Sequence, residues 1–198
     1  MKKWLLLILF PILIACSEPK QDRLPSEAVI LAFGDSLTHG VGASDSQDYP
    51  SVLAELTGMQ VINAGISGET TTSGVLRFQS VLDQHSPQLV ILMEGGNDII
   101  RKHDLKKTQT NLAKMIQTAL SRQIKVVLVG VPEKKLFANT ADFYQELANQ
   151  HDVIYEGDLL PDLLYDNQYK SDPIHLNAKG YRKFAEGLHQ LLMDKGVL

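Results

Sequence analysis

Ser36, Asp172 and His175 are the residues whose types and spacing most directly suggest chemistry. Ser36 lies in the stretch "AFGDSLTHG" (32–40), directly after an apolar run. Asp172 and His175 are three residues apart in "SDPIHLNAKGY" (171–181), so one imidazole nitrogen can donate a hydrogen bond to the carboxylate. The other nitrogen is then free to take a proton from the Ser36 hydroxyl, which is the logic of acyl transfer. The alternative is structural, with Ser36 and Asp172 as helix caps and His175 as a surface residue.

Two other stretches offer hydrogen-bond donors for the negative charge that develops in such a reaction. "NAGISGETT" (63–71) contains Gly68, whose backbone N–H can be approached closely because the residue has no Cβ. "MEGGNDII" (93–100) contains the side-chain amide of Asn97. With the N–H of Ser36 they make three donors from three loops, and removing one preorganised donor costs roughly 3–4 kcal/mol. Gly and Asn are also common turn formers, so each stretch alone has an ordinary explanation.

The elements that must position these residues alternate between strands and helices. Five apolar runs, rich in Val and Ile and nearly continuous, indicate strands that are buried on both faces of a parallel sheet. They span 28–33, 60–64, 88–94, 124–131 and 152–156. Helical spacing or helix caps mark the segments 49–58, 105–123, 141–150 and 177–196. This alternation predicts one three-layer α/β/α domain with right-handed crossovers.

The strand order is not fixed by the alternation itself. We expect the flavodoxin-like order 2-1-3-4-5, which is common for this type of fold. In that order the first and third strands are neighbours where the winding reverses, and ligands bind there beyond the carboxyl ends of the strands. Each chemically suggestive residue follows a strand, so we expect all of them at that edge.

Four blocks taken together resemble the SGNH hydrolases, also called the GDSL esterase and lipase family. They are "FGDSLTHGVGA", "NAGISGETT", "GGND" and "DPIHLNAKGY", and the resemblance covers residues 29–192. The chain is most similar to the bacterial thioesterase I, lysophospholipase and arylesterase branch, from which Pro173 departs because that branch often has Gly there. Nothing in the sequence resembles the "GxSxG" elbow of the α/β-hydrolases.

The resemblance implies a role for each candidate residue. Ser36 would be the nucleophile, His175 the base and Asp172 its partner, and Gly68 and Asn97 would join the Ser36 N–H as oxyanion donors. It also implies an SGNH hydrolase fold with a five-stranded parallel sheet. The implied substrates are small-molecule esters or thioesters of short to long acyl chains, lysophospholipids included.

The N-terminus predicts export and a lipid anchor. "MKKWLLLILFPILIAC" has two lysines, an apolar stretch too short to span a membrane comfortably, and a small residue before Cys16. Its end resembles the lipobox of bacterial lipoproteins, so we expect a signal peptide over 1–15 and lipid on Cys16, the single cysteine. Residues 17–27 then form a polar tether, and the hydrolase domain spans 28–198. The protein would lie at the periplasmic face of the cell envelope, with Ser17 a cue for the outer membrane. An uncut anchor or a buried thiol is the alternative.

Composition limits the partners and cofactors. The net charge of −4 argues against a nucleic-acid partner, which needs a basic face. The carboxylates and histidines lack metal-ligand spacing, and a Ser-His-Asp mechanism needs no cofactor. We expect a monomer.

Two other functions use the same sequence features. One is O-deacetylation of cell-envelope carbohydrate by the same residues. The other is a non-catalytic flavodoxin-like binding module, with Asp35 at the strand end as in receiver domains.

Apolar residues on two segments leave their role open. They either line an acyl or aryl pocket beside His175 or pack as a short core helix. They are Leu136 and Phe137 on one segment, and Leu159, Leu160, Leu163, Leu164 and Tyr165 on the other.

Overall fold

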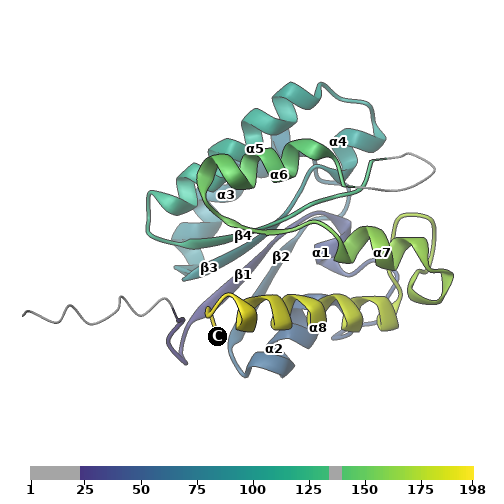
Figure 1. Ribbon diagram of the computed structural model, residues 1–198, viewed down its shortest axis with the longest axis horizontal. Coiled ribbons are helices and arrows are strands. Elements are labelled where there is room, and N and C mark those ends of the chain that lie inside the picture. The colour runs from purple at the N-terminus through teal and green to yellow at the C-terminus, as the bar shows by residue number, and fades with distance from the viewer. Residues whose placement is uncertain (1–22, 134–139) are drawn as a thin grey trace, which may run out of the picture.

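The fold is built around one parallel sheet. The computed structural model describes residues 23–133 and 140–198 (Figure 1). Within them, five strands pair in parallel in the order β2-β1-β3-β4-β5. Helices cover both faces of this sheet, so the three-layer α/β/α architecture and the strand order expected from the sequence are confirmed.

The strands coincide with the apolar runs of the sequence. They are β1 Val29–Gly34, β2 Gln60–Gly65, β3 Leu89–Met93, β4 Lys125–Val129 and β5 Ile154–Glu156. Every residue of the central strand β3 is buried, as a strand covered by helices on both sides requires. The edge strand β5 is the shortest, with three residues.

The helices divide between the two faces. They are α2 Tyr49–Thr57, α3 Thr71–His85, α5 Leu105–Leu120, α6 Asp142–His151 and α8 Ala178–Asp194, with the short α1 Ser36–His39, α4 Gly96–Ile100 and α7 Leu159–Tyr165. Figure 1 shows α3, α5 and α6 on one face and α2 and α8 on the other. A 3₁₀ turn, η1 Asn167–Tyr169, follows α7. Among the described residues, no helix has the length and apolar character needed to cross a membrane.

Helix α3 has no counterpart among the helices expected from the sequence. Its first turn contains two Thr, a Ser and a Gly, which are weak helix formers. Phe78 and Leu82 are nevertheless buried against the sheet side of the core. Tertiary packing, which a local pattern does not show, therefore stabilises this helix.

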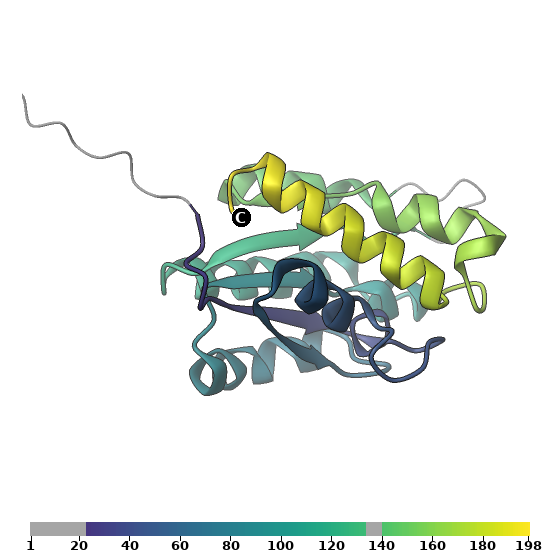
Figure 2. The same ribbon diagram turned by 90° about the horizontal axis from the view of Figure 1, so that it is seen from below.

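The carboxyl ends of the strands lie away from both described chain ends. α1 begins directly after β1, and α4 begins shortly after β3, at that edge. At the opposite end, the Leu24 N–H donates to the Val197 carbonyl at 2.7 Å. Figure 2 shows the start of the described chain and the C-terminus side by side there.

Candidate active site

The structure brings Ser36, His175 and Asp172 into one hydrogen-bonded row. His175 Nε2 lies 2.9 Å from Ser36 Oγ, across 139 positions of sequence. His175 Nδ1 lies 2.7 Å from Asp172 Oδ2. With Nδ1 protonated, Nε2 is a free acceptor for the Ser36 hydroxyl proton. This arrangement can activate a hydroxyl as a nucleophile.

Ser36 is positioned by the turn between β1 and α1. It is the first residue of α1, and the Asp35 side chain caps this helix by accepting from Leu37 N at 3.0 Å. The turn is tight at Gly34, where a Cβ would lie 2.3 Å from the Met93 carbonyl oxygen of the neighbouring strand. Because Gly34 has no Cβ, the chain can pass this close to β3, and Ser36 lies near the end of that strand.

Asp172 and His175 are held by the segment 170–176, which we call the base loop. The Asp172 Oδ1 atom accepts from the backbone N–H groups of Ile174 at 2.8 Å and His175 at 2.9 Å. Partial burial raises the pKa of Asp172, but hydrogen bonds from the His175 ring and these N–H groups outweigh it and hold the pKa below its usual value. The Asp172 side chain is 44% exposed and that of His175 is 13% exposed. The carboxylate thus stays charged at the rim while the imidazole is sheltered.

Asn97 lies at the start of α4 and faces the same site. Its Nδ2 atom donates to Asp35 Oδ2 at 3.1 Å, which uses one of the two amide hydrogens. The cavity beside Ser36 is lined by both residues. An amide held in this way has its second hydrogen available for an oxyanion.

Asp35 is itself almost completely buried, with 4% of its surface exposed. Desolvation raises its pKa to about 6, in spite of the hydrogen bonds from Leu37 and Asn97 and the nearby His175. Above this pKa the carboxylate is charged and fixes the Asn97 amide. From the sequence alone, Asp35 has a role only in the alternative of a binding module.

Gly68 lies after β2 at the same edge of the sheet. Its φ of +77° is a conformation that favours Gly, and its carbonyl accepts from Arg101 Nη2 at 3.0 Å. Among the described residues, no hydrogen bond from the Gly68 N–H is present. Gly68 is not among the residues that line the cavity.

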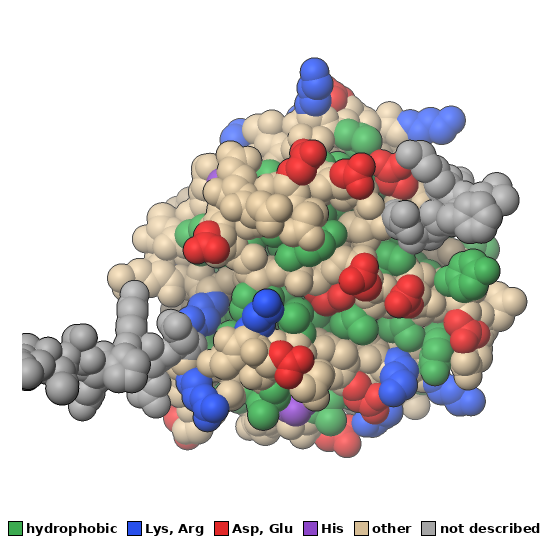
Figure 3. Space-filling view, in the orientation of Figure 1, with side chains coloured by type: hydrophobic (Ala, Val, Ile, Leu, Met, Phe, Trp, Pro, Cys, Tyr) green, Lys and Arg blue, Asp and Glu red, His purple; other side chains and the backbone are tan. Residues whose placement is uncertain are grey.

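A cavity of about 670 Å³ opens beside Ser36. Its walls are mainly apolar, with Ser36, Asn97 and Lys170 among the polar groups. The apolar lining residues are Leu37, Ile99, Ile100, Val131, Pro132, Leu164, Tyr165, Pro173 and Ile174. Figure 3 shows hydrophobic side chains and carboxylates sharing the surface on the side of α7.

The apolar residues of α7 are divided between the two roles considered for them, core packing and pocket lining. Leu160 and Leu163 are buried in the hydrophobic core. Leu164 and Tyr165 line the cavity, and Tyr165 is 74% exposed. One face of the helix is therefore core and the other is pocket. Leu136 and Phe137 lie outside the described residues, and so does Cys16.

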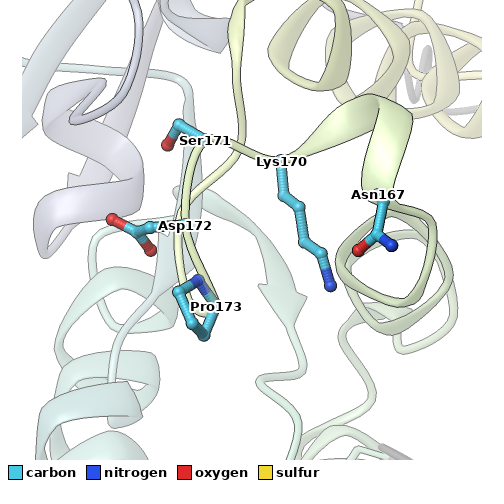
Figure 4. Close-up of a pocket in the computed structure, with 5 residues that line it drawn as sticks. All are labelled: Asn167, Lys170, Ser171, Asp172 and Pro173. Atoms are coloured by element: carbon cyan, nitrogen blue, oxygen red, sulfur yellow. The ribbon is translucent and has the colours of Figure 1, made fainter.

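A second hollow, of about 440 Å³, adjoins the base loop. Figure 4 shows its lining, in which the side chains of Asp172 and Lys170 extend to opposite sides of the chain. Lys170 and Pro173 line both this hollow and the cavity at Ser36. The Lys170 ammonium group donates to the Leu164 carbonyl at 3.1 Å, which joins the base loop to α7.

Of the polar residues grouped beneath the site, the sequence predicts a role in the reaction for Asn97 alone, and burial is complete or nearly so for Asp35, Glu69 and Glu94. We call this group the polar floor: Asp35, Glu69, Arg77, Glu94 and Asn97. Their partners come from different elements, so no local spacing reveals them. The one available signal is that each acid is adjacent to, or within three residues of, a candidate site residue. Among the described residues, no group of His, Cys, Asp or Glu is arranged to hold a metal ion.

The sequence matches those of known proteins over most of its length. The GDSL-like Lipase/Acylhydrolase family matches residues 32–183. The chain is 33% identical over 163 residues to an arylesterase of Vibrio mimicus, covering 77% of this chain and 78% of that protein. It is 31% identical over 146 residues to thioesterase 1/protease 1/lysophospholipase L1 of Escherichia coli strain K12, covering 73% of this chain and 66% of that protein.

A solved structure shares the fold. The esterase EstA from Pseudoalteromonas sp., inhibited by monoethylphosphonate, superposes with a TM-score of 0.76 at 21% identity, covering 85% of this chain and 98% of that one.

Proposed function

We propose a mechanism from the premise that the chain belongs to the GDSL-like lipase/acylhydrolase family and is a carboxylic ester hydrolase. The enzyme acts through a Ser36-His175-Asp172 triad and an acyl-enzyme. The observation that carries the proposal is the continuous row from Asp172 through His175 to the Ser36 hydroxyl.

In the first half of the reaction, Ser36 Oγ attacks the acyl carbonyl carbon and its proton passes to His175 Nε2. The tetrahedral intermediate collapses, the bond to the alcohol or thiol breaks, and the leaving group takes the proton from His175. Asp172 accepts the Nδ1–H hydrogen bond throughout, which keeps the ring oriented and stabilises the imidazolium.

In the second half, water attacks the acyl-enzyme and gives its proton to His175. Collapse of this intermediate returns the proton to Ser36 Oγ and releases the acid. Negative charge on the carbonyl oxygen is stabilised by the backbone N–H groups of Ser36 and Gly68 and by the Asn97 amide.

The apolar lining of the cavity favours binding of an acyl or aryl group of the substrate. Its volume of about 670 Å³ is of the size that holds small organic ligands. We infer that esters and thioesters with apolar acyl or aryl groups are its substrates. A cell-envelope carbohydrate would present hydroxyl groups to walls that offer few partners for them.

A panel of p-nitrophenyl esters from acetyl to palmitoyl, together with matched acyl thioesters, tests the proposal. The expected result is turnover that rises from acetyl to a longer chain and is abolished by Ser36→Ala. Ser73→Ala, which changes an exposed serine on α3, is the matched control and should retain turnover. Turnover of acetyl esters alone would favour carbohydrate deacetylation, and no turnover at all would favour a binding module.

We further propose that the mature protein is exported and lipid-anchored through Cys16. The basic, apolar and small-residue pattern of the N-terminus supports this. The described chain begins at the end of the sheet opposite α1, so a tether there would leave the cavity unobstructed. Cys16→Ser should release active enzyme from the membrane fraction. Retention of this variant after a high-salt wash would contradict the anchor.

A further inference from the structure

Glu94 is a fully buried carboxyl group for which the triad mechanism has no use. It directly follows β3, and none of its surface is exposed. No group in the described structure donates a hydrogen bond to its Oε1 atom. Its Oε2 atom accepts from Gly95 N at a long 3.3 Å. A charged carboxylate with so few partners would cost much free energy in such a place, whereas a neutral acid carries a proton that can be donated.

The groups packed around Glu94 come from several elements. Tyr144 of α6 donates its hydroxyl to the Glu94 backbone carbonyl at 2.6 Å. Gly74 of α3 lies so near that a Cβ there would be 3.4 Å from Oε1. The charged neighbours are Asp35 after β1 and Glu69 before α3, and Glu69 is within hydrogen-bonding reach. Glu94 therefore faces two acids.

Arg77 of α3 is committed to Glu69. Its Nε donates to Glu69 Oε1 at 2.7 Å, and its Nη2 donates to Glu69 Oε2. Nη2 also donates to the Ala64 carbonyl at 2.9 Å, and the guanidinium lies 3.9 Å over the Phe33 ring. Glu69 is therefore a compensated carboxylate, able to accept one more hydrogen bond.

We propose that Glu94 is held as a neutral carboxylic acid that donates to the Glu69 carboxylate, and that this acid pair positions the two loops carrying the oxyanion donors. Glu69 directly follows Gly68, and Glu94 is three residues before Asn97. The pair thus joins the end of β3 to the loop after β2. Glu94 and Glu69 are positioning residues, and their effect on the reaction rests on the oxyanion role proposed for Gly68 and Asn97.

The electrostatics agree with this geometry. Desolvation, the negative charges of Asp35 and Glu69 and the hydrogen bond with Glu69 all raise the pKa of Glu94 well above its usual value. The proton on Glu94 supplies a hydrogen-bond donor to the pair. A protonated Glu94 therefore explains why no group donates to its Oε1 atom.

Infrared spectroscopy tests the protonation state directly. The difference spectrum of the wild type minus Glu94→Gln, at mildly alkaline pH where ordinary carboxyl groups are ionised, should contain the carbonyl stretch of a protonated carboxylic acid. Glu156→Gln is the matched control, because Glu156 is a buried acid at the end of β5, away from the polar floor. Its spectrum should retain the band assigned to Glu94. A wild type without that band would overturn the proposal.

Kinetics tests the positioning role. Glu94→Met has a similar size but cannot donate, and it should lower kcat by roughly ten-fold or more with little change in KM, because small displacements of oxyanion donors are costly. Glu94→Gln keeps a donor toward Glu69 and should recover most of that loss. Equal losses in the Gln and Met variants, with both folded by circular dichroism, would overturn the positioning role. A wrong oxyanion assignment would instead show as full kcat in Asn97→Ala while the infrared band persists.

Discussion

The base loop and the polar floor meet at Ser36, yet they are held by opposite physical means. In the base loop, Asp172 is half-exposed and bonds to residues two and three positions away. In the polar floor, Asp35 and Glu94 are buried, and the Asp35–Asn97 contact spans 62 positions. Water screens charge in the first region, whereas in the second each charge must find compensation within the protein.

Because of this contrast, substitutions in the base loop should mainly affect catalysis, whereas substitutions in the polar floor should also affect stability. A charge removed from the base loop loses hydrogen bonds that water can largely replace, so its effect should fall on the reaction. A charge removed from the polar floor changes the cost of burying its neighbours, so its effect should extend to the folded state. Variants that remove one group from each region therefore test whether the two differ as described.

Asn97→Ala should give the largest loss among the variants that leave the triad intact. It removes a donor that bonds more strongly to the tetrahedral intermediate than to the ester, so kcat should fall by roughly 10²- to 10³-fold with KM almost unchanged. Steady-state kinetics on a neutral p-nitrophenyl ester measures both constants. A rise in KM at constant kcat would show that Asn97 only binds substrate.

Asp172→Asn should give a smaller loss, of roughly 10- to 100-fold in kcat, because water reaches this half-exposed side chain and can stabilise the imidazolium in part. Its free energy of unfolding at neutral pH should stay close to that of the wild type. Kinetics and urea unfolding of the same preparation measure the two effects. A large loss of stability with unchanged kcat would remove the distinction between the two regions.

Asp35→Asn should change how stability depends on pH. The folded-state pKa of about 6 exceeds the unfolded value of about 3.9, so the folded protein binds the proton more tightly. Stability from Asp35 is thus present below about pH 4 and is lost as pH rises through about 6, by about 2–3 kcal/mol in all. In Asp35→Asn, the free energy of unfolding should lack this part of the decrease with rising pH.

The measurement is urea unfolding between about pH 4 and 7 for both proteins. Asp172 has a lowered pKa and the opposite sign, so Asp172→Asn should keep the wild-type decrease over this range. Parallel curves for the wild type and Asp35→Asn would mean that Asp35 is not a buried acid with a raised pKa.

The same contrast explains how far the sequence could be interpreted. Asp172 and His175 lie within one turn of chain, so their pairing could be predicted, and the apolar runs mark the strands. The strand order was expected from the type of fold, because the runs themselves do not fix it. Glu69, Arg77 and Glu94 meet only after α3 has packed on the sheet, and α3 itself has a weak local signal. For α7, apolar residues alone did not distinguish core from cavity, because the helix contributes to both.

The central claim is that the base loop activates the Ser36 hydroxyl for attack on an acyl carbon. The most direct test is labelling of the folded enzyme with a fluorophosphonate, followed by peptide mass spectrometry. Phosphonylation of Ser36 alone, with loss of esterase activity in proportion to labelling and no label in Ser36→Ala, is the predicted result. Label on another residue, or full esterase activity in Ser36→Ala, would contradict the account.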